Sequence, residues 1–319
     1  QIGPTTGELR SMDNFEQFYN AYSKQVDFFA RRMVYFCNRG EICQRERGPL
    51  PCWSLLTDDC IKKGRDITNS GALYNFHSIC FMGTANTADS MVALKQLLFE
   101  QRKISAEELL NALKNNFEGY ETLRQLLLNK APKYGNDAQE VDEIAARIAM
   151  DFIKLMDTMR SPSGGRYFVH LFSFLCNVMF GKMVGATPDG RKAGEPIAYS
   201  LSAQQGRDVK GITAALNSLA KLPHKEAAGA SAAIIEIDPS LVAGEGGLKR
   251  FVSILKTAFN QGVGQLQFNI VTVERLKKAQ EDPEKYGNIP VRVAGFSQMF
   301  KLVDKPTQDH IIARTKHKR

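Results

Sequence analysis

Cysteine and histidine side chains bind metals and act as nucleophiles or bases, and this chain has six cysteines and five histidines. The cysteines form no CxxC pair and no Cys/His spacing typical of a zinc site, and no secretory signal precedes them. We therefore expect free thiols in a reducing cytoplasm, and no metal site. The six are Cys37, Cys43, Cys52, Cys60, Cys80 and Cys176.

A run of aromatic residues contains one of the histidines. Residues 167–174 read YFVHLFSF. If this segment is a β-strand, one set of side chains shares a face, because successive residues of a strand point to opposite sides. That set is Phe168, His170, Phe172 and Phe174. Such a face is either core, in which the histidine has a hydrogen-bond partner, or the wall of a pocket.

Five segments before residue 160 have the apolar spacing of an amphipathic helix. They are 13–36, 54–64, 89–101, 105–117 and 141–159. Asp13 is predicted to cap the first segment, and Asp89 or Ser90 the third. Ser105 and Glu108 have the spacing of a capping box at the start of the fourth.

The pattern changes after residue 160, and from about residue 200 short strands alternate with helices. Strand-like runs at 230–238, 266–271 and 291–296 are interleaved with helical patterns at 248–260, 273–280 and 305–315. Strands separated by helices favour parallel pairing, and therefore an α/β fold. The shift in composition near residue 200 suggests two domains, 1–199 and 200–319.

The composition is that of a folded protein, and it gives no sign of a nucleic-acid or membrane partner. The 319 residues are 43% hydrophobic, which is enough to bury a sizeable core. The formal net charge is +8, but aromatic and basic residues do not interleave as they do in a recognisable nucleic-acid-binding module. No apolar run reaches the length of a membrane span.

Several phrases of the sequence resemble those of the glycyl radical enzymes, in the order in which that family has them. They include DDCIKKGRDITNSGALYNF, TANTADSMVALKQLLFE, APKYGNDAQEVDEIA, SPSGGRY, MVGATPDGRKAGEP, LQFNI, VRVAGFSQMF and QDHIIARTKH. The ordered set spans essentially the whole chain, which therefore resembles the C-terminal portion of a pyruvate formate-lyase-like enzyme. The PKYGND and QFN phrases are most similar to the glycerol and choline dehydratase-lyase branch.

The resemblance implies both a fold and a radical site. Residues 1–199 would supply the second half of a ten-stranded α/β barrel, and residues 200–319 the glycyl radical domain. Gly295, in the phrase VRVAGF, would be the residue that stores the radical. Considered without its neighbouring phrases, a glycine in VRVAGF is more typical of a turn or bulge.

Glycine suits this chemistry because of what it lacks. A stable backbone radical needs a Cα that has lost one hydrogen and become planar, so that the unpaired electron is shared with the amide nitrogen and the carbonyl. A side chain would crowd that carbon, and glycine has none. Oxygen and water would quench the radical, so we expect a dry loop. The neighbours Val291, Val293, Phe296, Met299 and Phe300 are consistent with such a loop and equally with a core strand, so they do not discriminate between the two.

In this family the glycyl radical passes its spin to a cysteine, and the resulting thiyl radical takes a hydrogen atom from the substrate. In the dehydratase branch the cysteine loop commonly reads Gly-Cys-x-Glu, with the glutamate as base, and this motif does not occur here. Cys52 is the nearest candidate, but it lies downstream of the expected loop, and Ser54 stands where the glutamate should be. We therefore expect the thiyl cysteine and its base N-terminal to this chain, in a longer or a separate polypeptide.

The implied function is that of an anaerobic, oxygen-sensitive, cytoplasmic enzyme that cleaves a C–C or C–heteroatom bond of a small organic substrate. Candidate reactions are arylacetate decarboxylation, polyol dehydration and formate C-acetyltransferase-like chemistry. A radical S-adenosylmethionine activating enzyme would install the radical after the glycyl domain swings outward, no organic cofactor would be bound, and a homodimer is expected. The alternative is a non-catalytic glycyl-domain protein that restores or regulates a partner radical enzyme.

The resemblance also gives hints about specificity. In relatives the segment after the GG-x-Y phrase borders the substrate pocket, which makes Phe168, His170 and Phe172 candidate pocket residues. An aromatic wall with one histidine would suit an aryl substrate, whereas a small polyol would want more hydroxyl and carboxylate partners. We expect Arg191 and Arg292 to bind carbonyls or carboxylates near the glycyl loop. We expect His224, His310 and His317 to lie at the surface or at helix ends.

Overall fold

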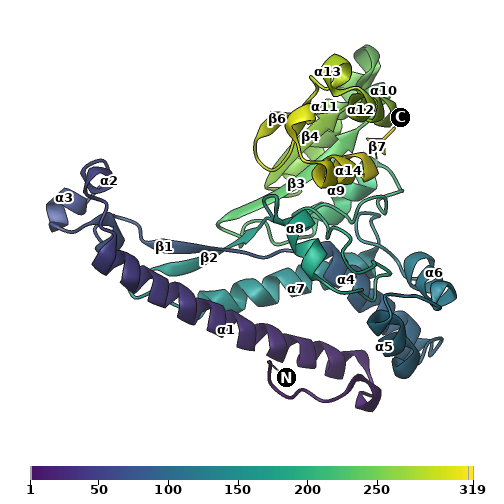
Figure 1. Cartoon of the computed structure of the whole chain (residues 1–319), viewed down its shortest axis with the longest axis horizontal. Helices are drawn as coiled ribbons and strands as arrows, with labels where there is room; N and C mark the ends of the chain where they lie inside the picture. Colours follow the sequence, from purple (N-terminus) through teal and green to yellow (C-terminus); the bar gives the residue numbers. More distant parts are fainter. Residues whose placement is uncertain (1, 315, 319) are drawn as a thin grey trace. The chain divides into compact units, whose positions relative to one another are not determined.

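The computed structural model describes residues 2–314 and 316–318, and Figure 1 shows the course of the chain. The chain divides into two compact units, each assembled from two stretches of sequence. The first unit holds Gln1–Ile79 and Met150–His170, and the second holds Cys80–Ala149 and Leu171–Arg319. The predicted boundary between 1–199 and 200–319 stays a prediction.

The long helix α1 (Phe15–Arg47) is the main element of the first unit. Asn14, rather than the predicted Asp13, caps it by accepting a hydrogen bond from the amide of Gln17. The helix also runs well past its predicted end at residue 36. The other elements of this unit are η1 (Leu9–Ser11), α2 (Pro51–Leu55), α3 (Cys60–Lys63), η2 (Ile67–Asn69), most of β1 (Phe76–Cys80) and most of β2 (Arg166–Leu171).

Helices form the first part of the second unit. The predicted cap at Asp89 or Ser90 is wrong, because α4 (Thr84–Ala93) begins earlier and continues into the π-helical segment η3 (Leu94–Glu100). The cap at Ser105 is confirmed, since its hydroxyl accepts from the amide of Glu108. The remaining helices here are α5 (Ala106–Lys114), α6 (Glu121–Asn129), α7 (Gln139–Asp157, which continues into the first unit), α8 (Cys176–Met183) and α9 (Ile212–Ala220).

A parallel β-α-β unit organises the C-terminal part of the second unit, as the alternating pattern predicts. Strand β3 (Ala230–Ile237) pairs in parallel with β4 (Gln265–Ile270) and with the short β7 (Lys316–His317). Between β3 and β4 the chain forms α10 (Pro239–Val242) and α11 (Gly244–Asn260). The chain then forms α12 (Val273–Glu281), α13 (Pro283–Tyr286), β5 (Pro290–Arg292), β6 (Ser297–Met299), η4 (Phe300–Leu302) and α14 (Lys305–Ala313). The α/β fold class is therefore confirmed, and Thr315, at the end of the last predicted helix, lies outside the described residues.

The predicted strand over residues 167–174 is shorter than expected. Strand β2 ends at Leu171, and Phe174 adopts a left-handed conformation with φ of +49°. Alternation therefore holds only inside β2, where Phe168 and His170 lie on the less buried face. The single face expected for all four residues does not hold for Phe172 and Phe174, because both lie beyond the end of β2 and Phe174 itself is not extended.

Candidate functional site

Gly295 lies at the tip of the hairpin formed by β5 and β6. The two strands are antiparallel, with Arg292 opposite Ser297, and the amide of Val293 donates to the carbonyl of Phe296 at 2.9 Å. The tip therefore consists of Ala294 and Gly295. Gly295 has φ of +84°, close to the value that the second central residue of a type II turn requires. This geometry gives a conformational reason for glycine at the tip.

Crowding does not require the glycine. A Cβ added to Gly295 would meet only the Cζ of Phe172, at an ordinary contact distance of 3.8 Å. At Gly165, by contrast, an added Cβ would lie 2.3 Å from the carbonyl oxygen of Asn75, which no side chain could accept. The Cα of Gly295 is therefore sterically open, as a carbon must be if another molecule is to remove its hydrogen.

The residues around the tip differ in burial. Val291, Val293, Ala294 and Phe300 are buried, whereas Gly295 itself is exposed. Phe296 and Met299 are 46% and 41% exposed. The expectation of a dry loop is thus wrong for Gly295 and Phe296 within this chain, although Ala294, the other residue of the turn, is buried.

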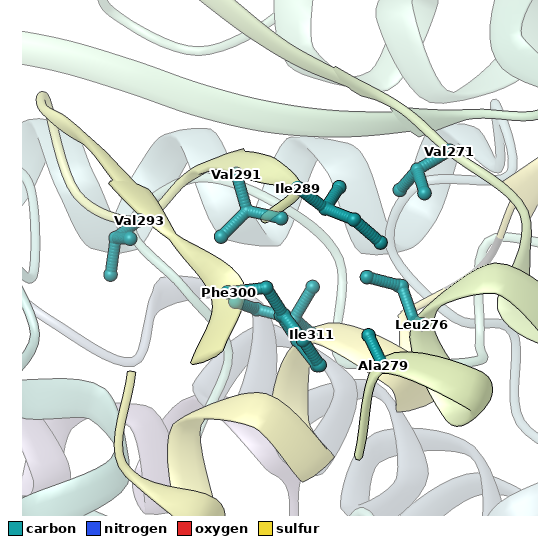
Figure 2. Close-up of a cluster of buried hydrophobic side chains, with 8 residues drawn as sticks. All are labelled: Val271, Leu276, Ala279, Ile289, Val291, Val293, Phe300 and Ile311. Carbon is teal, nitrogen blue, oxygen red and sulfur yellow. The ribbon is translucent and has the colours of Figure 1, made fainter. Parts of the chain in front are cut away.

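Two hydrophobic clusters hold the hairpin. Figure 2 shows the first, in which Val291, Val293 and Phe300 lie among residues that follow β4 or belong to α12 and α14. Its buried members are Val271, Leu276, Ala279, Ile289, Val291, Val293, Phe300 and Ile311. The second cluster consists of Phe172, Tyr199, Ala232, Ile234 and Ala294. Because Ala294 belongs to the second cluster and Val293 to the first, the chain is anchored on both sides immediately before Gly295.

Two carboxamides of β4 bind the backbone of the hairpin. The Oε1 atom of Gln267 accepts from the amide of Gly295 at 3.2 Å and from Nε of Arg292 at 2.9 Å. Asn269 accepts from the amide of Arg292 at 2.6 Å and donates to its carbonyl at 3.2 Å. The expectation that Arg292 binds a carbonyl near the glycyl loop is confirmed, since Nε of its guanidinium donates to the side-chain carbonyl oxygen of Gln267.

A buried ionic network lies behind these carboxamides. Oε1 of Glu236, on β3, accepts from Asn269 at 2.9 Å and from Nη1 of Arg314 at 3.0 Å, while Lys316 lies 3.4 Å from its other oxygen. The guanidinium of Arg314 also lies over the ring of Tyr199. Burial lowers the pKa of Lys316, although the charge of Glu236 acts in the opposite direction. One carboxylate therefore faces two buried cations and one of the carboxamides that hold the hairpin.

The structure assigns the predicted pocket residues to different units. Phe172 belongs to the second unit, where its ring lies against Gly295, forms a T-shaped pair with Phe174 at 4.5 Å and contacts Tyr199. Phe168 and His170 belong to the first unit, where Phe168 contacts the ring of Phe76 at 4.9 Å. Burial lowers the pKa of His170. Phe172 is thus placed beside the tip, and the pocket role of Phe168 and His170 stays a prediction.

Three of the remaining four histidines, expected at the surface or at helix ends, are not at the surface. His224, His310 and His317 are all buried, and each has a polar partner. His224 bonds to Ser231 and to the carbonyl of Leu219, His310 to Asn177 at 3.0 Å, and His317 to Asp208 at 3.0 Å. His310 lies in the last turn of α14, as expected of a helix end, whereas His317 lies in β7 and His224 between α9 and β3.

Arg191 has the structural role expected of it. Its guanidinium is fully buried and donates to the carbonyls of Val184, Gly185, Lys192 and Glu195. All six cysteines are free thiols, with Cys43 and Cys52 exposed and Cys60 buried. Among residues 2–314 and 316–318, no group of three or more His, Cys, Asp or Glu residues could hold a metal ion. Within the same described residues, no helix has the length and apolarity needed to cross a membrane.

Gln267 and Asn269 are the residues of the site to which sequence reasoning assigned no role. Each appeared only as part of the QFN phrase. The sequence does contain a signal for these two residues, because carboxamide and apolar side chains alternate along β4. In the structure the carboxamides at 267 and 269 are buried while Leu266 and Phe268 are less so, which is the reverse of the usual order.

Comparison with known proteins places the chain in a class of radical enzymes. Residues 1–181 match the family described as pyruvate formate lyase-like, and residues 197–301 match the domain described as glycine radical. The chain therefore belongs to the pyruvate formate lyase-like family, and within that superfamily to the glycyl radical enzymes.

Several relatives of the chain are dehydratases or lyases. The chain is 35% identical to trans-4-hydroxy-L-proline dehydratase of Clostridioides difficile over 99% of its own length and 40% of the relative's. It is 32% identical to indoleacetate decarboxylase of Tractidigestivibacter scatoligenes, with coverages of 99% and 39%. The glycerol-bound B12-independent glycerol dehydratase of Clostridium butyricum superposes with a TM-score of 0.97 at 40% identity, over 100% of this chain and 40% of that one. The chain thus spans about 40% of the length of the relatives it matches.

Proposed function

We propose that Gly295 stores an organic radical. The observation that carries this proposal is the sterically open Cα of Gly295 at a hairpin tip, within the residues that match the glycine radical domain. Activation removes one hydrogen atom from that carbon by homolysis of the C–H bond. The abstracting radical receives the hydrogen atom and becomes closed-shell, and one electron stays unpaired on Gly295.

The stored radical then acts through a cysteine thiol. Gly295 takes the hydrogen atom of the thiol, and the resulting thiyl radical abstracts a hydrogen atom from a C–H bond of the substrate. After the substrate radical loses its leaving group, the product radical takes the hydrogen atom back from the thiol. No external oxidant or reductant is consumed in this cycle.

We propose that the relay cysteine and its base lie outside residues 1–319. The exposure of Gly295 supports this arrangement, because a radical at an uncovered hairpin tip would react with water and oxygen. A covering segment that carries the thiol would both shield the tip and bring the sulfur to it. In the same proposal, a radical S-adenosylmethionine enzyme activates the protein while the glycyl domain is swung outward, and the assembled enzyme is a cytoplasmic homodimer.

Dehydration of a hydroxylated substrate, a C–O bond cleavage, is the reaction that we favour. It is supported by the 40% identity to the glycerol dehydratase and the 35% identity to the hydroxyproline dehydratase. Decarboxylation of an arylacetate is the second candidate, and the aromatic contacts of Phe172 with Phe174 and Tyr199 beside Gly295 favour it. Formate C-acetyltransferase-like chemistry is the third.

The proposed function is tested by turnover with a substrate panel. Full-length protein is activated anaerobically and assayed with glycerol, 1,2-propanediol, trans-4-hydroxy-L-proline, arylacetates, and pyruvate with coenzyme A. We expect turnover of one class in the wild type and none in Gly295→Ala. Gly194→Ala is the matched control, because Gly194 also has a positive φ, +82°, and open space around it. Equal turnover by Gly295→Ala and wild type would refute the proposal.

A further inference from the structure

The orientation of the Gln267 side chain is fixed by the groups around its oxygen. The amide of Gly295 and Nε of Arg292 are both hydrogen-bond donors, and both point at the same atom of Gln267. A flipped carboxamide would place an NH₂ group against two donors. The atom facing the Gly295 amide must therefore be the carbonyl oxygen, an acceptor.

Gln267 is a poor choice for stability alone. Its side chain is almost fully buried, at 5% exposure, yet its Nε2 atom has no hydrogen-bond partner within the described part of the chain. Burying an amide donor without a partner opposes folding, and an apolar side chain of similar size would avoid that penalty. The position therefore calls for an acceptor, and the acceptor's partners include the amide of the residue that we propose stores the radical.

A rigid element holds this acceptor. Gln267 is in the middle of β4, directly opposite Ile234 in the parallel ladder with β3. β3 is buried along almost its whole length. The oxygen of Gln267 is therefore a hydrogen-bond acceptor at a fixed position. The turn that it binds is otherwise anchored through the residues that precede Gly295.

We propose that Gln267 is a positioning residue for the glycyl radical, an inference that rests on the proposed function of Gly295. Its oxygen holds the amide that joins Ala294 to Gly295. The spin shared by the amide nitrogen depends on the angle between the amide plane and the plane of the radical carbon. By accepting from that amide, Gln267 limits this angle and favours donation of electron density from the nitrogen to the electron-poor carbon.

The test combines three variants of the full-length protein with electron paramagnetic resonance after anaerobic activation. Gln267→Met removes the acceptor and keeps the side-chain length, whereas Gln267→Glu keeps an acceptor oxygen beside Arg292. Gln308→Met is the matched control, because Gln308 is also buried and donates to the carbonyls of Phe300 and Val303, but does not bond to Gly295.

We expect Gln267→Met to lower the number of spins per chain about fivefold, the factor that one net hydrogen bond makes in an equilibrium. We also expect it to change the splitting from the α-hydrogen and, in protein labelled with ¹⁵N-glycine, the nitrogen coupling. Gln267→Glu and Gln308→Met should retain the wild-type spin count within about twofold, since each leaves an acceptor for Gly295 in place.

Three outcomes would overturn the inference. One is a Gln267→Met spectrum and spin count equal to those of the wild type. Another is a loss of spins in Gln267→Glu as large as in Gln267→Met, because a hydrogen-bond acceptor at this position would then have no effect on the radical. The third is an equal loss in Gln308→Met, which would point to general weakening of the domain. Absence of any radical signal in the wild type would instead contradict the proposed function, and this inference with it.

Discussion

Asn269 binds Arg292 as a neighbouring strand would. Its carboxamide accepts from the amide of Arg292 at 2.6 Å and donates to the carbonyl of the same residue at 3.2 Å. A side chain thus occupies the place of a backbone peptide, and the hairpin docks on β4 through carboxamides at Gln267 and Asn269. Attachment of this kind involves few hydrogen bonds, which is consistent with the proposed outward movement of the hairpin during activation.

Asn269→Leu should loosen this docking. The backbone amide and carbonyl of Arg292 lose their partner, and we expect the free energy of unfolding to fall by roughly 1–3 kcal/mol. Hydrogen exchange of amides in residues 290–299 should accelerate more than exchange elsewhere in the second unit. The exposed Asn129→Leu is the control, with an expected effect within about 0.5 kcal/mol. Unchanged exchange in the hairpin of Asn269→Leu would contradict this role.

Glu236→Leu should destabilise the second unit strongly. It leaves Arg314 and Lys316 buried without their carboxylate, and breaking a buried pair of this kind costs about 3–5 kcal/mol. Denaturant unfolding measures the loss. The triple variant in which Arg314→Met and Lys316→Met accompany Glu236→Leu should recover most of it, because no unpaired charge remains buried. A triple variant as unstable as the single one would show that charge compensation is not what Glu236 provides.

The stability of the chain should fall as the pH drops below 6.5, in part because of His310. Burial, together with the charges of Arg314 and Lys316, lowers the pKa of His310 well below its ordinary value of 6.5. Between these two pKa values the unfolded chain binds a proton that the folded chain does not, so acid favours unfolding. The loss is about 1.4 kcal/mol per pH unit for one such group.

The variant His310→Gln measures the contribution of His310 to the pH dependence of stability. Unfolding free energies of wild type and variant are compared at pH 7.5 and pH 5.5. We expect the wild type to lose more stability than the variant over this interval, because glutamine does not titrate. Parallel losses in the two proteins would mean that His310 has no part in the pH dependence.

Phe172→Leu should change the choice of substrate. Phe172 is the side chain that contacts the position of an added Cβ on Gly295, and leucine keeps an apolar side chain there. If the ring borders the substrate, the ratio of kcat/KM for aryl and polyol substrates should shift by roughly tenfold, as expected for a change of pocket shape. Phe174→Leu is the control, since Phe174 pairs with Phe172 but is half exposed. Equal kcat/KM ratios in wild type and Phe172→Leu would show that Phe172 does not border the substrate pocket.

The α/β fold and the family could be predicted from sequence because they rest on local or ordered signals. Apolar periodicity located most of the helices, and the alternation of strands and helices after residue 200 predicted the parallel pairing of β3 and β4. Helix boundaries differ from the prediction where tertiary packing overrides local caps. Aspartate is a residue type that often caps helices, yet Asp89 is buried inside α4 and accepts hydrogen bonds from Tyr134 and Arg207.

The site was only partly predictable because its parts come from segments far apart in the sequence. Gly295 was identified through its phrase, but its partners lie on β4, on β3 and after β2. Burial of His310 and the ionic network of Glu236 depend on how α14 packs against α8 and α12 and on how β7 pairs with β3, which no local pattern encodes. The exposure of Gly295 was missed for the same reason, since apolar neighbours in sequence do not guarantee a covered tip.

The most direct test of the central claim is the electron paramagnetic resonance spectrum of the anaerobically activated full-length protein. We predict a doublet from the single remaining α-hydrogen, which collapses when the protein contains glycine deuterated at Cα. The doublet should be absent in Gly295→Ala and present in the matched variant Gly194→Ala. A doublet that persists in Gly295→Ala would place the radical on another residue and contradict the account.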